Sequence, residues 1–142
     1  MIYLDTGCFV KLYYPETDSA KVIALIHGKP VCYTPLHELE SVNALQLKVF
    51  LKNATATQAA AARSLIEADA KSGVLMSVTA EWNDIFREAV NLAELYSASL
   101  GCRSLDVLHC AAARVLAASE FVSTDARQKS LATAMGLNLV TF

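Results

Sequence analysis

The chain begins with the stretch Met1-Ile2-Tyr3-Leu4-Asp5-Thr6-Gly7, and the rest of the sequence is best understood by working outward from it. Its apolar part, Ile2 to Leu4, is too short for a helix and predicts a buried strand. Asp5 follows that strand directly. In open α/β sheets, ligands bind just beyond the carboxyl ends of the strands, so we expect Asp5 to lie at a functional site.

The 142 residues predict a single domain, residues 1–142, that is large enough for a hydrophobic core. Hydrophobic residues make up 54% of the chain and charged residues only 18%, which argues against a disordered protein. No apolar run reaches the roughly 20 residues of a membrane span, and the N-terminus lacks a signal-peptide pattern, so we expect a cytoplasmic protein without membrane contact. The net charge of −2 and the lack of a basic stripe do not point to nucleic acid. If a metal site takes up four of the fourteen acids, however, ten acids remain against twelve bases, and this balance of surface charge permits RNA binding without pointing to it.

Strands and helices alternate along the chain, which predicts an α/β fold with a mainly parallel five-stranded sheet. Short apolar runs predict strands at residues 2–4, 31–33, 74–78, 121–123 and 138–141. Caps, periodicity and breakers predict helices starting near residues 6, 19, 35, 55, 82, 105 and 126. Thr34 and Thr55 are expected to be the N-caps of the third and fourth helices, and Gly73 is expected to end the fourth. The apolar stripe of the third helix is expected at Leu36, Leu39, Leu47 and Phe50. That of the fifth helix, which we expect to end at Gly101, is expected at Trp82, Ile85, Phe86, Ala89, Ala93 and Tyr96.

Four carboxylates stand at positions that suit a metal site. Asp5 and Asp125 each follow a predicted strand, and Glu40 and Asp106 each lie in the first two turns of a predicted helix. Hard divalent cations such as Mg²⁺ and Mn²⁺ prefer oxygen ligands, and acidic sites of this kind carry out metal-assisted hydrolysis of phosphodiesters. Each of these acids taken singly also suits a turn, a cap or a helix dipole, so the order of all four carries the interpretation.

The sequence resembles the PIN-domain family, of the VapC toxin type, over essentially the whole chain. Four short motifs in this order carry the resemblance: Ile2-Tyr3-Leu4-Asp5-Thr6, Thr34-Pro-Leu-His-Glu-Leu-Glu40-Ser-Val-Asn43-Ala-Leu, Gly101-Cys-Arg-Ser-Leu-Asp106-Val-Leu-His109-Cys-Ala-Ala-Ala and Ser123-Thr124-Asp125-Ala-Arg-Gln. The resemblance implies a three-layer α/β/α sandwich and a Mg²⁺- or Mn²⁺-dependent ribonuclease. Family members usually form homodimers and are held inactive by a cognate antitoxin.

The resemblance also implies roles for particular residues. The acidic quartet of the family is matched by Asp5, Glu40, Asp106 and Asp125, and its supporting polar positions are matched by Thr6, Asn43 and Thr124. Asp5 and Asp106 are expected to be the principal metal ligands. Glu40 and Asp125 are expected to bind directly, through water or at a second ion. Gly7 departs from the family, which often has Ser at this position, so one hydroxyl of the first loop is missing.

We therefore predict a metal-dependent endoribonuclease that hydrolyses RNA phosphodiester bonds and is the toxin of a toxin–antitoxin pair. The alternative is a non-catalytic PIN scaffold that binds RNA or a protein partner. A phospho-acceptor receiver domain is excluded because Met76-Ser77-Val78-Thr79 offers no acceptor Asp at the third strand. A haloacid-dehalogenase-type phosphatase is excluded because Gly7 replaces its second Asp.

Several other reactive residues have a structural and a functional interpretation. His109 and His37 lie three residues from two of the acids, and we expect packed core-edge rings rather than proton carriers, whereas His27 is expected at the surface. Arg103 and Arg127 flank two acids and suit RNA phosphate or charge balance equally. The four cysteines show no CxxC spacing and are expected to be buried apolar side chains: Cys8, Cys32, Cys102 and Cys110.

Overall fold

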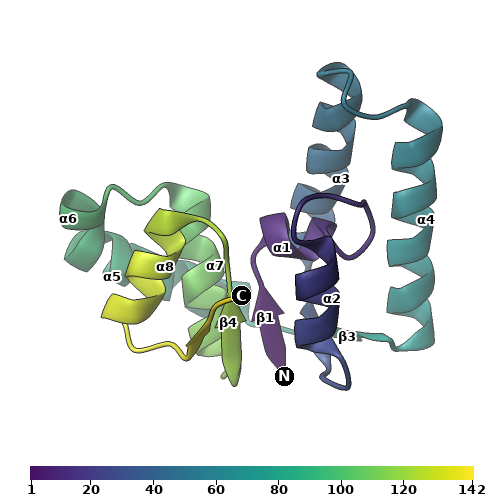
Figure 1. Ribbon diagram of the computed structural model, residues 1–142. Coiled ribbons are helices and arrows are strands. Elements are labelled where there is room, and N and C mark those ends of the chain that lie inside the picture. Colours follow the sequence, from purple (N-terminus) through teal and green to yellow (C-terminus); the bar gives the residue numbers. More distant parts are fainter. The chain divides into compact units, whose positions relative to one another are not determined.

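The structure is a computed structural model that describes every residue from Met1 to Phe142. The chain divides into two compact units, each of which is described by itself (Figure 1). Unit 1 comprises Met1–Asp5 and Thr79–Thr141, and unit 2 comprises Thr6–Val78 together with Phe142.

The five strands and the helices alternate as predicted. The strands are β1 (Ile2–Leu4), β2 (Val31–Tyr33), β3 (Leu75–Ser77), β4 (Glu120–Val122) and β5 (Leu139–Val140). The helices are α1 (Thr6–Val10), α2 (Ser19–Ile26), α3 (Pro35–Phe50), α4 (Ala56–Ser72), α5 (Trp82–Leu92), the π-helix η1 (Ala93–Ser97), α6 (Ala98–Leu100), α7 (Ser104–Val115) and α8 (Ala126–Ala134). The strand pairs within both units are parallel, which confirms the predicted α/β fold with a parallel sheet. None of the helices is long and apolar enough to cross a membrane.

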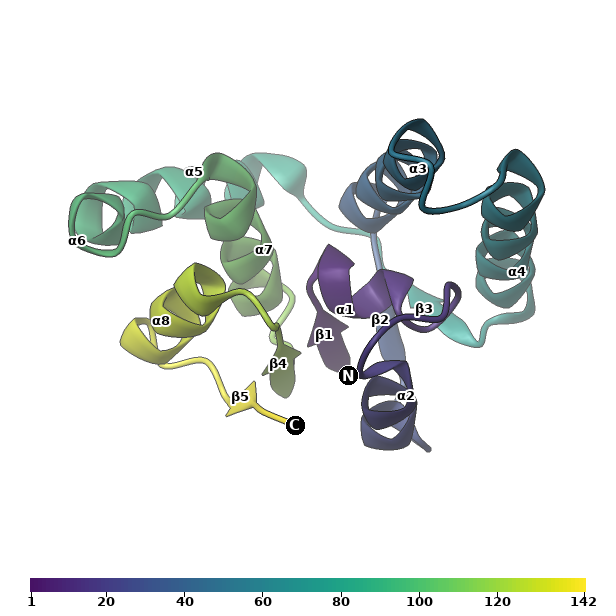
Figure 2. The same ribbon diagram turned by 45° about the horizontal axis from the view of Figure 1, so that its top comes forward.

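In unit 1, β4 lies between β1 and β5. The Tyr3 ring of β1 stacks on the Phe121 ring of β4 with centroids 5.9 Å apart, and both side chains are buried. Helix α7 packs against α5 and α8 (Figures 1 and 2). All eight residues from Asp106 to Ala113 are buried, and the last four, Cys110 to Ala113, have small side chains that let neighbouring elements approach α7 closely. The carboxylate of Asp106, in the first turn of α7, is therefore buried in the interior of unit 1.

In unit 2, β2 pairs with β3, and α3 lies beside α4 (Figures 1 and 2). The predicted N-caps are confirmed, because the Thr34 and Thr55 hydroxyls accept hydrogen bonds from the third helical N–H of α3 and α4. Helix α4 ends as predicted at Gly73, whose φ of 79° is the left-handed conformation that glycine adopts without strain.

The predicted apolar stripe of α3 is wrong for three of its four residues. Leu36 is buried, but Leu39 is 68% exposed and Phe50 is 79% exposed, and Leu47 is exposed as well. The side chains that α3 buries lie on another row of the helix: Leu36, His37, Ser41 and Leu45. Periodicity alone could not identify the buried row, because the apolar residues of α3 lie on more than one face and the positions of α1 and α4 select one of them.

The helix that begins at Trp82 is also less regular than predicted. It changes into the π-helix η1 and resumes as the short α6 before Gly101, where φ is 65°. Within the predicted stripe, Ile85 is fully buried but Phe86 is exposed, and Leu92, which the stripe omitted, is buried. These residues all precede η1, so the π-turn is not the cause: Ile85 and Leu92 lie two turns apart on one face of α5, whereas Phe86 lies about 100° around the helix from Ile85.

Candidate active site

Asp5 lies where its position after a strand predicted, directly beyond the carboxyl end of β1. Its backbone N–H donates a hydrogen bond to the Val122 carbonyl oxygen of β4 at 2.9 Å, so the parallel pairing of the strands extends to this residue. The residue is only 3% exposed. The hydroxyl of Ser123 donates to Asp5 Oδ2 at 2.5 Å. Asp5 is thus a buried carboxylate that a neighbouring hydroxyl helps to hold in place.

Asp125 is the N-cap residue of α8 and is partly exposed. Its Oδ1 accepts hydrogen bonds from the backbone N–H groups of Arg127 and Gln128 at 2.8 and 3.1 Å. Its own backbone N–H donates to Ser123 Oγ at 3.0 Å. The Ser123 hydroxyl therefore connects Asp5 with the start of α8, donating to the first and accepting from the second.

Asp106 is the third residue of α7 and is 8% exposed. Its Oδ2 accepts from the Arg103 backbone N–H at 2.9 Å, which is a helix-capping contact. Its Oδ1 accepts from Gln128 Nε2 at 3.3 Å. No Lys, Arg or His side chain forms an ion pair with Asp106, and its polar contacts are the hydrogen bonds from Arg103 and Gln128.

Burial and the charges of these carboxylates raise the pKa of two thiols in unit 1. Burial raises the pKa of the Cys102 thiol, and the negative charges of Asp106 and Asp125 raise it further. Burial likewise raises the pKa of Cys110, with contributions from Cys102, Asp106 and Asp5. The three carboxylates of unit 1 therefore lie close to the same pair of thiols. All four cysteines are free, and three are buried as expected, while Cys102 is partly exposed.

Glu40, the fourth predicted acid, belongs to unit 2 and is partly exposed on α3. Its Oε2 accepts a hydrogen bond from the Thr6 hydroxyl at 2.7 Å, so one predicted supporting residue contacts one predicted acid. Asn43 is exposed on the same helix and makes no hydrogen bond through its side chain. Gly7 is exposed in the first turn of α1.

Sequence reasoning missed two side chains that contact the acids, Ser123 and Gln128. It singled out Thr124 instead, which is exposed and forms no side-chain hydrogen bond. A signal for Gln128 was present, because Asp125 followed three residues later by Gln128 is the pattern of a capping box. Ser123 had no comparable signal beyond its place at the end of a strand.

The histidines have structural partners, as expected. His109 is buried, and its Nδ1 lies 3.0 Å from the Tyr3 hydroxyl. His37 is buried in the capping box of α3, with Nδ1 2.8 Å from the Thr34 hydroxyl oxygen. His27 is exposed.

The two arginines next to the acids differ from the other arginines of the chain. Arg63, Arg87 and Arg114 each form an ion pair with a carboxylate. Arg103 is exposed and Arg127 is partly exposed, and neither guanidinium forms an ion pair. Both positive charges thus remain open to a ligand.

The donor atoms around Asp5 and Asp106 suit a hard divalent cation. They are carboxylate, hydroxyl and amide oxygens, which Mg²⁺ and Mn²⁺ prefer, and one buried amide oxygen, Gln128 Oε1, has no hydrogen-bond partner. No three His, Cys, Asp or Glu side chains of the chain are arranged to hold a metal ion by themselves. This arrangement still fits Mg²⁺, which commonly takes one or two carboxylates and keeps several waters.

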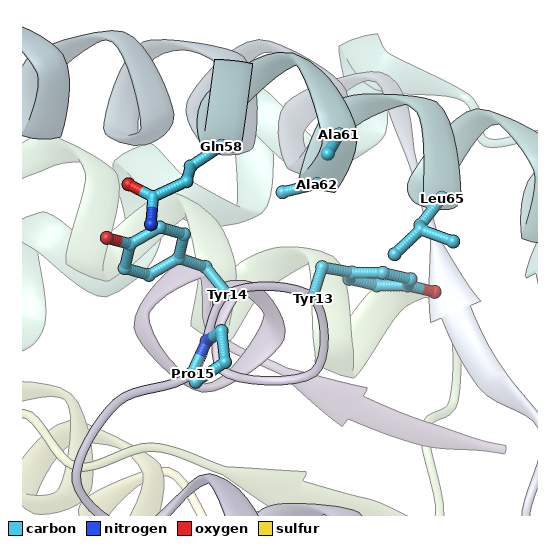
Figure 3. Close-up of a pocket in the computed structure, with 7 residues that line it drawn as sticks. All are labelled: Tyr13, Tyr14, Pro15, Gln58, Ala61, Ala62 and Leu65. Atoms are coloured by element: carbon cyan, nitrogen blue, oxygen red, sulfur yellow. The ribbon is translucent and has the colours of Figure 1, made fainter. Parts of the chain in front are cut away.

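A separate pocket of about 360 Å³ lies within unit 2 (Figure 3). The rings of Tyr13 and Tyr14 face one side of α4 there, which presents Ala61, Ala62 and Leu65. None of the four predicted acids lines this pocket, so it is distinct from the carboxylates described above.

Comparison with known proteins identifies the class to which this fold belongs. The family model of the PIN domain matches residues 2–134, and the chain therefore belongs to the PIN domain family. Among solved structures, the crystal structure of FitAcB from Neisseria gonorrhoeae is similar, with 12% sequence identity and a TM-score of 0.65. The match covers 99% of this chain and 97% of that chain, and at this identity it shows a shared fold alone. No curated protein matches the chain.

Proposed function

We propose that this protein is a metal-dependent endoribonuclease that hydrolyses phosphodiester bonds of RNA. The observation that carries the proposal is the hydrogen-bonded group of Asp5, Ser123, Asp125, Asp106 and Gln128 in unit 1. Two of its carboxylates are buried, and a divalent cation would balance their charge. Membership of the PIN domain family supports the same conclusion, because PIN domains are generally nucleases.

Asp5 and Asp106 are the proposed principal ligands of Mg²⁺ or Mn²⁺. Asp125 and Glu40 would bind directly, through water or at a second ion; the place of Glu40 rests on the family resemblance. Such an ion, when bound, polarises the phosphate and lowers the pKa of a bound water molecule.

The side chains around these acids have a positioning role in the proposal. Ser123 orients Asp5, and Thr6 orients Glu40, through the hydrogen bonds described above. Partners of this kind fix the direction in which a ligand oxygen points, and their loss typically weakens a metal site. Thr124 and Asn43 are retained as supporting residues on the family resemblance alone.

The substrate would be held by positive charge near the acids. Arg103 and Arg127 are candidates for phosphate contacts, because neither guanidinium is engaged in an ion pair. Guanidinium groups bind phosphate oxygens well, since their N–H donors match the geometry of the anion.

The biological role that we propose is that of a toxin held inactive by a cognate antitoxin. Partner proteins and a homodimer are supported by the large apolar side chains that α3 and its end expose, which are Leu39, Leu47, Phe50 and Leu51. We further propose that residues 1–142 form one PIN-like domain, because a single family model spans segments of both units, and that the protein acts in the cytoplasm.

The first test is a cleavage assay of the purified protein on a structured RNA mixture with Mn²⁺ or Mg²⁺. We expect cleavage that EDTA abolishes and that the Asp5→Asn variant lacks, with a loss of at least about 100-fold because one principal ligand is weakened. Asp84→Asn serves as the matched control, since Asp84 is an exposed residue of α5 that pairs with Arg87. It should cleave as the wild type does.

A folded preparation that is free of antitoxin and cleaves no RNA with either ion would contradict the proposal. It would favour the non-catalytic scaffold, which should still bind RNA or a protein partner. Cleavage that persists in Asp5→Asn would instead contradict the assignment of Asp5.

A further inference from the structure

Gln128 is a buried polar residue at the start of α8 whose side chain is only half satisfied. It is 7% exposed, and its Nε2 donates to Asp106 Oδ1 at 3.3 Å. Its other amide atom, Oε1, is buried and has no hydrogen-bond partner, and it is the only buried side-chain nitrogen or oxygen of the chain in this state. Buried polar groups in native proteins are nearly always paired, so each exception calls for an explanation.

The local geometry explains how Oε1 lost its usual partner. Gln128 is the third residue of α8, and in a capping box its side-chain oxygen would accept a hydrogen bond from the backbone N–H of the N-cap residue. Here that N–H, on Asp125, donates to Ser123 Oγ instead. The amide of Gln128 is therefore released from the cap and lies against Asp106.

Packing alone does not account for a glutamine at this position. An apolar side chain of similar length, such as Met, would fill the same volume without burying an unpaired oxygen. A primary amide carries an NH₂ group with two donors and an oxygen acceptor, and burial of the oxygen is offset only when it accepts a hydrogen bond in the working protein. The NH₂ group already holds Asp106, so the unpaired oxygen is available to a donor that a bound ligand brings.

We propose that Gln128 is a positioning residue for the cation site: Nε2 orients the Asp106 carboxylate, and Oε1 accepts a hydrogen bond from a water molecule of the bound divalent ion. Water on a cation presents only donors to its surroundings, and Mg²⁺ and Mn²⁺ retain several waters, so an acceptor next to a ligand carboxylate complements them. This inference rests on the proposed function, because it requires that a divalent ion binds at Asp5 and Asp106.

The test is binding of Mn²⁺ in the absence of RNA, followed by the electron paramagnetic resonance signal of the free ion, together with thermal unfolding in EDTA. Gln128→Met removes both the donor and the acceptor. We expect its affinity for Mn²⁺ to fall by about 10- to 100-fold, as for other partners of metal ligands. Its Tm without metal should stay close to that of the wild type, because the variant loses the hydrogen bond to the buried Asp106 Oδ1 but no longer buries an unpaired amide oxygen.

A second variant, Gln128→Glu, gives the opposite signature while keeping the shape of the side chain. It places a second negative charge beside Asp106, so its Tm in EDTA should fall, and Mn²⁺ should raise that Tm by more than it raises the wild-type value. Gln46→Met is the matched control, because Gln46 is exposed on α3, and it should change neither quantity.

The outcomes separate this inference from the proposed function. If the wild type binds Mn²⁺ and Gln128→Met binds it equally well, Gln128 has no role at the cation site and the inference is overturned alone. A purely structural role is shown if both variants lose stability in EDTA and keep the wild-type Mn²⁺ affinity. Wild-type protein that binds no Mn²⁺ overturns the inference and the proposed function together.

Discussion

Ser123 and Thr124 are adjacent hydroxyl residues with opposite environments. Ser123 is buried and its hydroxyl contacts Asp5 and the backbone of Asp125, whereas Thr124 is exposed. We expect Ser123→Ala to reduce metal-dependent RNA cleavage by about 10- to 100-fold, because Asp5 loses the hydrogen bond that orients it. In initial rates measured across a Mn²⁺ titration, the loss should appear chiefly as a higher Mn²⁺ concentration needed for the half-maximal rate.

Thr124→Ala is the natural comparison for Ser123→Ala. This substitution should change the rate of RNA cleavage only slightly, because the exposed Thr124 side chain makes no hydrogen bond. If Thr124→Ala proved the more damaging of the two, the family-based role of Thr124 would stand and the importance given to Ser123 would be wrong.

Arg103 offers a second prediction for a single residue. If its guanidinium binds a phosphate, Arg103→Ala should weaken RNA binding and lower the slope of log affinity against log salt by about 0.7, the value for one phosphate of a single strand. Binding is best measured in the Asp5→Asn background, where the RNA stays intact. Arg87→Ala, which removes an exposed and ion-paired guanidinium, should leave the slope unchanged.

At the scale of elements, an ion-pair network connects the segment before α2 with α3 and with the residue that follows α1. The Glu16 carboxylate bonds to the Lys48 ammonium of α3, and its Oε2 lies 3.4 Å from Lys11 Nζ. Burial by itself raises the pKa of Glu16, but the hydrogen bond and charge of Lys48, with those of Lys11, outweigh burial and lower that pKa. The ionised form is thus favoured in the folded protein.

The lowered pKa predicts how stability depends on pH. Because the folded pKa lies below the unfolded one, Glu16 stabilises the fold above the unfolded pKa of about 4.3, and this contribution is lost as the pH falls through the folded pKa. Glu16→Gln should therefore cost about 0.5–1 kcal/mol at pH 7. In urea unfolding, followed by far-UV circular dichroism, the difference from the wild type should shrink from pH 6 toward pH 3.

Glu67→Gln provides the control for this prediction. Glu67 pairs with Arg63 on the exposed face of α4, where solvent screens the interaction. The free energy of unfolding of Glu67→Gln should match that of the wild type at pH 6 and at pH 3. A Glu16→Gln variant with an equal deficit at every pH would show that the lost contact is packing rather than charge.

At the scale of the whole molecule, the proposed homodimer predicts that the exposed apolar side chains of α3 are covered in solution. Phe50→Asp should convert a dimer to a monomer, as measured by light scattering after size exclusion, because a buried carboxylate without a partner is costly. Phe86→Asp, on the exposed face of α5, is the comparison. Dissociation by Phe86→Asp alone would place the interface on α5 instead.

Local sequence signals explain why so much of the fold could be predicted. Apolar runs as short as Val31–Tyr33, the N-caps at Thr34 and Thr55 and the terminator Gly73 act within a few residues, so their structures follow from the neighbouring sequence. The same holds for the position of Asp5 after β1 and of Asp106 in the first turn of α7. Because these signals are local, the family and the α/β fold class could be predicted from the sequence.

Only the tertiary structure decided which faces are buried and which side chains meet. Leu39 and Phe50 fit a helical stripe and yet are exposed, because the row of α3 that packs inward depends on elements elsewhere in unit 2. The contacts of Asp106 with Gln128, 22 residues apart, and of Asp5 with Ser123, 118 apart, depend on how β4, α7 and α8 pack. The sequence by itself determined the elements and the candidate acids, since local propensities act over a few residues. The hydroxyl and the amide that orient those acids were decided by long-range packing, which leaves no local pattern in the chain.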